Sequence, residues 1–407
     1  MLPSAPAARV ALDAAGDRAG DSRRVKQALI TGATGFVGGR LAEVAFERGV
    51  EFVALVRAWS RATRLARLPI RMISGNVLDL DSLREAMQGC DVVFHCAVDN
   101  RAGREDHRRS SVQGTANVMQ AALELGVKRV VHLSSVAVYS YQPGSDAATE
   151  EGAYRYSGDA YCDGKIDGEK VALRYYREHG LPVTVLRPTV VYGPFGSLST
   201  ETTTAVRQGR LVLIKGGSGI CNTLYVDNLI QAMLLAAVCD NAAGEILHIS
   251  DARPVTWKEF IEAHARALGN SCLPLPEMTI REIRAAREEQ RKQASSWQQI
   301  RRLMRDPQTE KTLRSIPIVR RVVGLALPQP IRRGLSRRLS GEKVNGAPKR
   351  AVQTRSRPLP SRDEVDIQNS NIVFSIEKAR RILGYDPRIA FAEGMERTAA
   401  WIKWARL

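Results

Sequence analysis

The alternation of strands and helices is the feature that most limits the fold of this chain. From Gln27 to Arg187, short runs rich in β-branched residues alternate with amphipathic stretches. This pattern predicts a parallel sheet covered by helices on both faces. The expected strands are Ala28–Thr31, Phe52–Val56, Arg71–Ser74, Val92–His95, Val130–Leu133 and Val183–Leu186. The expected helices lie near Phe36–Arg48, Asp81–Gln88, Gln113–Leu125 and Tyr161–His179.

A glycine-rich segment joins the first expected strand to the first expected helix. In such a turn one glycine makes the tight bend, one lets the backbone approach a pyrophosphate, and one lets helix and strand pack closely. The phosphate charge then lies at the helix N-terminus, where free N–H groups favour an anion. A turn and a packing contact alone would explain three glycines, but the βαβ context favours a dinucleotide site. Its expected residues are Gly32, Thr34, Gly35, Phe36, Val37 and Gly38.

The residue that follows the second expected strand bears on the choice of cofactor. Enzymes that use NAD normally carry an acid there, which binds the adenine ribose hydroxyls, whereas this chain has Arg57. An arginine pairs with a 2′-phosphate instead, and Arg61 and Arg64 could join it. A solvated basic loop explains Arg61 and Arg64 equally well. We therefore favour NADP(H) as the cofactor, and NAD(H) stays open.

Tyr161 and Lys165 are four residues apart at the start of an expected helix, so both side chains fall on one face. A nearby ammonium group favours the phenolate, so we expect Lys165 to lower the pKa of Tyr161 and equip it to transfer a proton. Ser134 and Ser135 follow another expected strand. The carboxyl ends of parallel strands are where open α/β sheets bind ligands.

These motifs together resemble the extended short-chain dehydrogenase/reductases, the family of the NAD-dependent epimerases and dehydratases. The resemblance covers about 27–250 and 372–404. It rests on Thr31-Gly-Ala-Thr-Gly-Phe-Val-Gly38, Phe94-His-Cys-Ala97, Gly114-Thr-Ala-Asn117, Ser134-Ser-Val-Ala-Val-Tyr139, Tyr161-x-x-x-Lys165, Leu186-Arg-Pro-Thr-Val-Val-Tyr-Gly-Pro194 and Tyr225-Val-Asp-Asn228.

The resemblance implies a role for each matching residue. Tyr161 would be the proton donor or acceptor, Lys165 a cofactor ribose ligand that also tunes Tyr161, and Ser135 the hydrogen-bond partner of the reacting oxygen. Ser134 would be structural, and Asn117 would serve packing and hydrogen bonding. The remaining cofactor contacts would come from Asn76, Val77 and Ala97.

Departures from the family pattern narrow the reaction. Dehydratases of the family carry acids directly after the hydroxyl residue, where this chain has Val136 and Ala137, so dehydration is disfavoured. Pro188-Thr189 stands where many sugar-nucleotide enzymes have an asparagine, which resembles members that act on less polar alcohols. The sequence thus predicts hydride transfer at a secondary alcohol or ketone of a small molecule. A sugar-nucleotide epimerase with retained NAD and a non-catalytic dinucleotide-sensing protein are the alternatives.

The domain organisation follows from where the alternation of expected strands and helices ends. We expect a doubly wound α/β fold of the Rossmann type over 27–187, after a disordered leader at 1–26. A smaller substrate lobe would comprise 188–273 and 371–407, with some segments free to return to the sheet. A long basic insertion, partly helical or disordered, would occupy 274–370. Thr256 and Glu259 form an expected capping box at one helix of the lobe.

The insertion holds most of the excess charge. Lys311 to Arg357 contains thirteen basic residues and one acid, which accounts for twelve of the seventeen net positive charges of the chain. Within Ile316–Leu339, an amphipathic pattern with arginines on its polar side is typical of a helix on an anionic membrane. A solvated excursion is equally favoured. Nucleic acid is disfavoured because no aromatic residues are interleaved.

The six cysteines show neither a disulfide framework nor a zinc pattern, and we expect no metal site. They are typical of reduced thiols, so we expect a cytoplasmic protein, peripheral at the inner face of a membrane if the insertion binds there. A homodimer stays open.

Overall fold

The computed structural model describes residues 25–98, 104–140, 145–269, 275–293 and 359–407. Nearly all of the expected leader and the whole of Ile316–Leu339 lie outside the described residues. The chain divides into two compact units: one runs to Glu277 and resumes over Arg362–Leu407, and the other is Met278–Ser361. Within the second unit, α9 (Ile280–Gln293) begins with the side chains of Thr279 and Glu282 bonded to each other's backbone N–H groups.

The first unit is built on a parallel sheet in the order β11-β6-β5-β4-β1-β2-β3, which confirms the predicted doubly wound fold. Because β1 pairs with both β2 and β4, the winding direction reverses at β1, and ligands bind at such reversal points in open α/β sheets. The strands are β1 (Gln27–Thr31), β2 (Glu51–Val56), β3 (Arg71–Ser74), β4 (Val92–His95), β5 (Arg129–Leu133), β6 (Val183–Pro188) and β11 (Ile246–Ile249).

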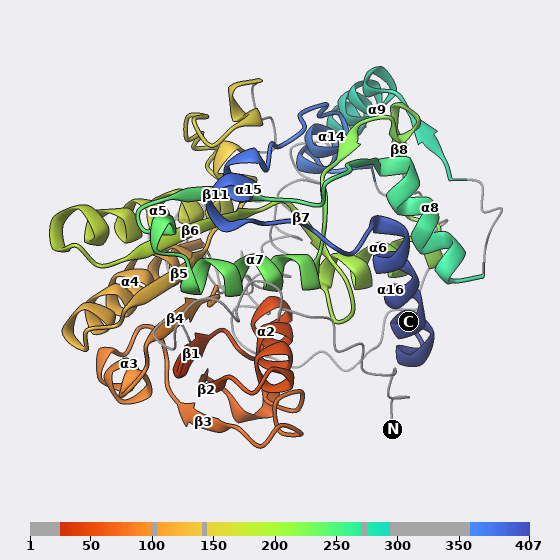
Figure 1. Ribbon diagram of the computed structural model, residues 1–407. Coiled ribbons are helices and arrows are strands. Elements are labelled where there is room, and N and C mark those ends of the chain that lie inside the picture. The colour runs from red at the N-terminus through yellow and green to blue at the C-terminus, as the bar shows by residue number, and fades with distance from the viewer. Residues whose placement is uncertain (1–24, 99–103, 141–144, 270–274, 294–358) are drawn as a thin grey trace, which may run out of the picture. The chain divides into compact units, whose positions relative to one another are not determined.

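Helices cover both faces of this sheet, and each face has its own apolar core (Figure 1). One core packs α3 (Leu80–Met87), α4 (Arg104–Glu124) and α5 (Ala160–His179) against the strands. The other packs α2 (Phe36–Glu47), α7 (Val226–Val238) and α15 (Glu377–Leu383). Helix α4 begins nine residues before the expected start. The sequence pattern missed its first turns because they are polar and show no helical spacing of apolar residues.

The lobe beyond β6 is made of short elements around a third core (Figure 1). Two small sheets pair β7 (Val190–Tyr192) with β10 (Thr223–Tyr225), and β9 (Ile220–Cys221) with β12 (Val255–Thr256). The helices are α6 (Ser197–Arg207), α8 (Trp257–Ala267), α14 (Arg362–Gln368) and α16 (Phe391–Ala405). The expected capping box of Thr256 and Glu259 is present at α8. Strand β11 comes from this part of the sequence but joins the main sheet beside β6.

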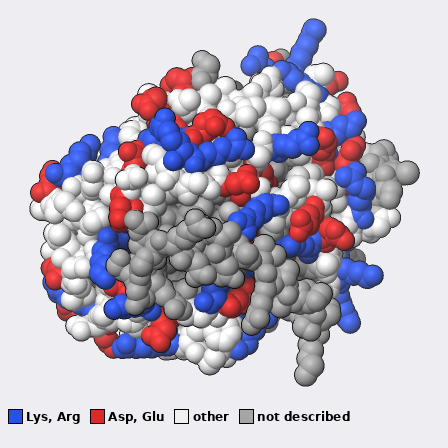
Figure 2. All heavy atoms as spheres, viewed as in Figure 1, with Lys and Arg blue, Asp and Glu red and all other residues white. Residues whose placement is uncertain are grey.

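Among the described residues on the face that Figure 2 shows, acidic and basic side chains are interspersed. Across the described part of the chain, none of the helices is both long enough and apolar enough to cross a bilayer.

Candidate active site

The glycine-rich turn between β1 and α2 forms a cradle that only small residues fit. Gly32 has φ +71°, and a Cβ there would lie 2.8 Å from the backbone of Cys96 and Ala97. A Cβ on Gly38 would overlap the carbonyl of Gly32. Helix α2 begins after Gly35, whose lack of a side chain leaves the first N–H groups without a side-chain cap. These features fit the pyrophosphate of a dinucleotide.

The other residues predicted to contact the cofactor, which are Asn76, Val77 and Ala97, lie around the same end of the sheet. The Ala97 N–H donates to Thr31 Oγ1 at 3.3 Å, which ties the loop after β4 to the end of β1. Asn76 Oδ1 accepts from the Leu78 N–H at 3.1 Å, and Val77 is buried. The Asn117 side chain donates to the Val77 carbonyl at 3.0 Å, as expected of a packing residue.

The arginines after β2 lie in two different environments. Arg57 and Arg61 are exposed. Arg64 instead binds Glu43 of α2 through Nε at 2.9 Å and Nη2 at 2.7 Å, and its guanidinium lies 4.4 Å from the ring centre of Phe195. The expectation that Arg64 joins Arg57 at a 2′-phosphate is therefore wrong, because a nearly buried carboxylate already holds its guanidinium.

Ser135, Tyr161 and Lys165 come together from β5 and α5. Asp159 caps α5 by accepting from the Tyr161 N–H at 3.0 Å. Ser135 caps the short 3₁₀ helix that follows β5, and its side chain hydrogen-bonds the Tyr161 hydroxyl. Lys165 Nζ donates to the Leu133 carbonyl at 2.7 Å and lies 5.8 Å from the centre of the Tyr161 ring.

Burial controls the electrostatics of these groups. It lowers the pKa of Lys165 to about 8, against the opposing influence of Cys96 and Glu169. Burial also raises the pKa of Tyr161, and the Ser135 hydrogen bond only partly opposes this rise. The predicted lowering by Lys165 is therefore wrong. The ammonium group is turned to the Leu133 carbonyl, and desolvation of the phenolate outweighs other influences.

Sequence reasoning missed a buried polar cluster directly behind this site. Glu169 is fully buried and forms an ion pair with Arg187 at 2.7 Å. Glu169 follows Lys165 by four residues, so helical spacing could have placed it on the same face. No sequence rule pairs it with an arginine on β6.

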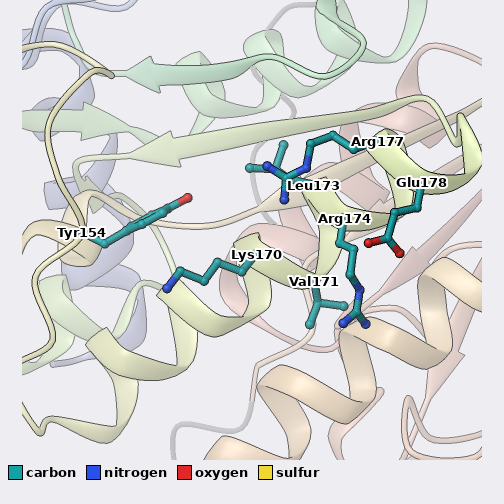
Figure 3. Close-up of a pocket in the computed structure, with 7 residues that line it drawn as sticks. All are labelled: Tyr154, Lys170, Val171, Leu173, Arg174, Arg177 and Glu178. Atoms are coloured by element: carbon teal, nitrogen blue, oxygen red, sulfur yellow. The ribbon is translucent and has the colours of Figure 1, made fainter.

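A hollow of about 450 Å³ lies on the exposed side of α5 (Figure 3). It contains none of the predicted site residues. Its lining is Tyr154, Lys170, Val171, Leu173, Arg174, Arg177 and Glu178. The described residues include no cluster of three or more His, Cys, Asp or Glu side chains that could hold a metal ion.

Known proteins resemble this chain in sequence and in fold. The family model described as "NAD dependent epimerase/dehydratase family" matches residues 28–250. A 4-hydroxy-2-methyl-3-oxo-4-farnesyl-3,4-dihydroquinoline-1-oxide ketoreductase of Stigmatella aurantiaca is 29% identical over 57% of this chain and 70% of its own length. A 2-alkyl-3-oxoalkanoate reductase of Shewanella oneidensis is 28% identical over 62% and 69%. The solved dTDP-glucose 4,6-dehydratase DesIV of Streptomyces venezuelae has a TM-score of 0.63 and 22% identity, covering 93% of this chain and 98% of its own.

The fold and the glycine cradle define a nucleotide-binding α/β enzyme. More particularly, the chain belongs to the NAD-dependent epimerase/dehydratase family of extended short-chain dehydrogenase/reductases, whose members are NAD(P)-dependent enzymes.

Proposed function

We propose that this protein is an NADP(H)-dependent oxidoreductase that interconverts a secondary alcohol and a ketone on a substrate with a large apolar part. The observation that carries the proposal is the grouping of Ser135, Tyr161 and Lys165 with Val136 and Ala137 directly after the serine. Apolar side chains at those two positions cannot remove a proton, so the site suits hydride transfer without dehydration. The names of the two sequence relatives, which specify ketones with farnesyl or alkyl groups, support the substrate class.

In the proposed reduction, Tyr161 donates its hydroxyl proton to the carbonyl oxygen. Ser135 donates a hydrogen bond to the same oxygen. A dinucleotide held by the cradle of Gly32, Gly35 and Gly38 would supply the hydride for the reduction and would accept it in the reverse reaction. Because burial raises the pKa of Tyr161, this side chain is protonated near neutral pH, which is the form that ketone reduction needs. Lys165, one turn along α5, would bind the ribose of the cofactor, and its ammonium group lies 5.8 Å from the centre of the Tyr161 ring.

The glycine cradle and the exposed Arg57 support the choice of cofactor. Gly32, Gly35 and Gly38 would hold the pyrophosphate, and Arg57 would pair with the 2′-phosphate of NADP(H). Arg61 lies in the same exposed loop and would assist. The side chains of Asn76 and Val77 would line the adenine side, beside Ala97.

The test is turnover of a small panel with each cofactor. We expect NADPH consumption with a 2-alkyl-3-oxoalkanoate or a prenylated aromatic ketone, and no epimerisation of UDP-glucose. Mass spectrometry of the denatured protein would detect any dinucleotide retained from purification. Retained NAD together with UDP-glucose epimerisation would replace the proposal by the epimerase alternative. Cofactor binding without turnover of any member of the panel would favour the dinucleotide-sensing alternative.

A further inference from the structure

A cluster of polar side chains, buried except for the half-buried Tyr154, lies along the same side of α5 as Tyr161 and Lys165, and we call it the Glu169 cluster. Its members are Ser134, Tyr154, Glu169 and Arg187. The side chain of Glu169 is 0% exposed and that of Arg187 is 2% exposed. An ion pair this deep is costly to desolvate unless its remaining hydrogen-bonding positions are filled.

The carboxylate of Glu169 has its hydrogen-bonding positions filled. Oε1 accepts from the hydroxyl of Ser134 and from Arg187 Nε at 3.0 Å. Oε2 accepts from Arg187 Nη2 at 2.7 Å and from the Tyr154 hydroxyl at 2.9 Å. One side chain of α5 therefore ties together the ends of β5 and β6 and the loop that carries Tyr154.

Two of the elements that this carboxylate joins, the end of β5 and α5, carry residues of the proposed site. Ser134 directly precedes Ser135 at the end of β5. On α5, Tyr161, Lys165 and Glu169 follow one another at intervals of four residues, so they lie along one side of the helix. The distance between the Ser135 hydroxyl and the Tyr161 hydroxyl thus depends on how β5 is joined to α5.

We propose that Glu169 is a positioning residue of the reaction: through Ser134 it holds Ser135 at hydrogen-bonding distance from Tyr161, and through its charge it supports the ammonium form of Lys165. This inference rests on the proposed function, because it assigns Ser135 and Tyr161 to the chemistry. The Ser134 hydroxyl fills one of the hydrogen-bonding positions that a buried carboxylate needs. Because Ser134 directly precedes Ser135, the same bond also fixes the end of β5 beside α5, and this placement carries the additional role.

The charge effect acts within a defined set of groups around Lys165. Cys96 of the loop after β4 and Glu169 of α5 act to raise its pKa, while burial lowers that pKa to about 8. The buried imidazoles of His95 on β4 and His132 on β5 also face Lys165, which helps burial to hold their pKa values low. Glu169 is the carboxylate among the described groups that act on Lys165.

The first experiment isolates the Ser134 contact. Ser134→Ala should lower kcat about 10-fold, because a small displacement of a catalytic group has effects of this size, while the Kd for NADPH stays unchanged. Ser134→Thr keeps a hydroxyl and should recover most of kcat. Ser250→Ala is the matched control, since Ser250 also follows a strand of the main sheet, is equally buried at 2%, and donates to the Thr223 carbonyl. It should keep the wild-type kcat.

Equal kcat for the Ser134→Ala, Ser250→Ala and wild-type proteins would overturn the positioning role. The substrate is the fastest-reacting ketone of the panel above, and Tyr161→Phe is assayed beside it. If Tyr161→Phe keeps full turnover, the proposed function has failed. If it is inactive while Ser134→Ala is fully active, only the present inference has failed.

The second experiment needs no substrate. The pKa of Lys165 would be measured by NMR on protein with ¹³Cε-labelled lysine, with Lys165→Arg to assign the resonance. Glu169→Gln combined with Arg187→Gln removes both charges, so that no buried charge is left alone in the fold. The pKa of Lys165 in this double variant should fall below the value measured in the wild-type protein. An unchanged pKa would overturn the charge effect.

Discussion

Two nearly buried glutamates, one behind the catalytic face and one on the cofactor helix, are paired in opposite ways. Glu169 on α5 has one cation, Arg187, and fills its other positions with hydroxyl groups. Glu43 on α2 is bound by three cations: Arg40 at 3.2 Å, Arg64 at 2.7 Å, and Arg67. Burial acts to raise the pKa of Glu43, but these guanidinium groups hold it at about 2.

The difference shows how each region tolerates change. Among the described residues, Glu169 and Arg187 form an ion pair only with each other, so loss of either one leaves the other as an unpaired buried charge. The Glu43 group is redundant, so one arginine can be lost while the carboxylate stays paired. It also links α2 to the neighbouring helix α7, since Arg40 binds Asp227 of α7 at 2.6 Å. On the catalytic side, the ion pair therefore fixes the position of one carboxylate. On the cofactor side, the group of arginines holds α2 against its neighbours.

The largest expected effect tests this contrast directly. Arg187→Met should lower the free energy of unfolding by about 3–5 kcal/mol, because it leaves the buried Glu169 carboxylate without a cation. Arg64→Met should cost about 1 kcal/mol, because Arg40 and Arg67 remain on Glu43. Urea unfolding of the two variants beside the wild type measures both values. Similar losses in the two variants would show that the contrast between the glutamates is wrong.

The next effect separates chemistry from cofactor binding. Tyr161→Phe removes the hydroxyl that transfers the proton and keeps the ring, so kcat should fall by a factor of about 100 or more. The Kd for NADPH should not change, because the glycine cradle is untouched. Stopped-flow assays and calorimetric titration measure the two quantities. Wild-type turnover in this variant would remove Tyr161 from the mechanism.

A smaller effect is expected on the cofactor side alone. NADPH should bind the wild type more tightly than NADH, and Arg57→Asp should reverse that order by about 10-fold through loss of the charged pair with the 2′-phosphate. Calorimetric titration of both cofactors is the measurement, with Arg71→Asp as a control on an exposed arginine of β3. A wild-type preference for NADH would return the protein to the NAD-binding type.

The smallest effect per residue concerns neither glutamate but the basic segment Ile316–Leu339, which we propose attaches the protein to anionic membranes. Each arginine near such a surface contributes about 1 kcal/mol, screened by salt. Replacing Arg332, Arg333, Arg337 and Arg338 with Gln should release the protein from phosphatidylserine vesicles in sedimentation assays without changing NADPH binding. Wild-type protein that stays in the supernatant at low salt would leave the solvated excursion as the explanation.

Much of the fold could be predicted because its signals are local. Five of the six expected strands begin and end within one residue of the observed ones, and the sixth, β6, continues two residues further, to Pro188. Gly180 ends α5 at φ +69°, as a helix stop should. Strand β11 could not be assigned, because four apolar residues after a loop do not say which sheet they join. Its place beside β6 is set by packing against α15.

The features of the site also fall into those that local sequence determines and those that tertiary structure determines. Sequence spacing by itself determined that Tyr161 and Lys165 share a helix face and that three glycines shape a turn before α2, since both follow from backbone geometry over a few residues. Only the tertiary structure decided that Arg64 binds Glu43, that the pKa of Tyr161 rises, and that Glu169 meets Arg187 and Ser134. These outcomes depend on which charges are buried together, and burial is set by segments far apart in the sequence.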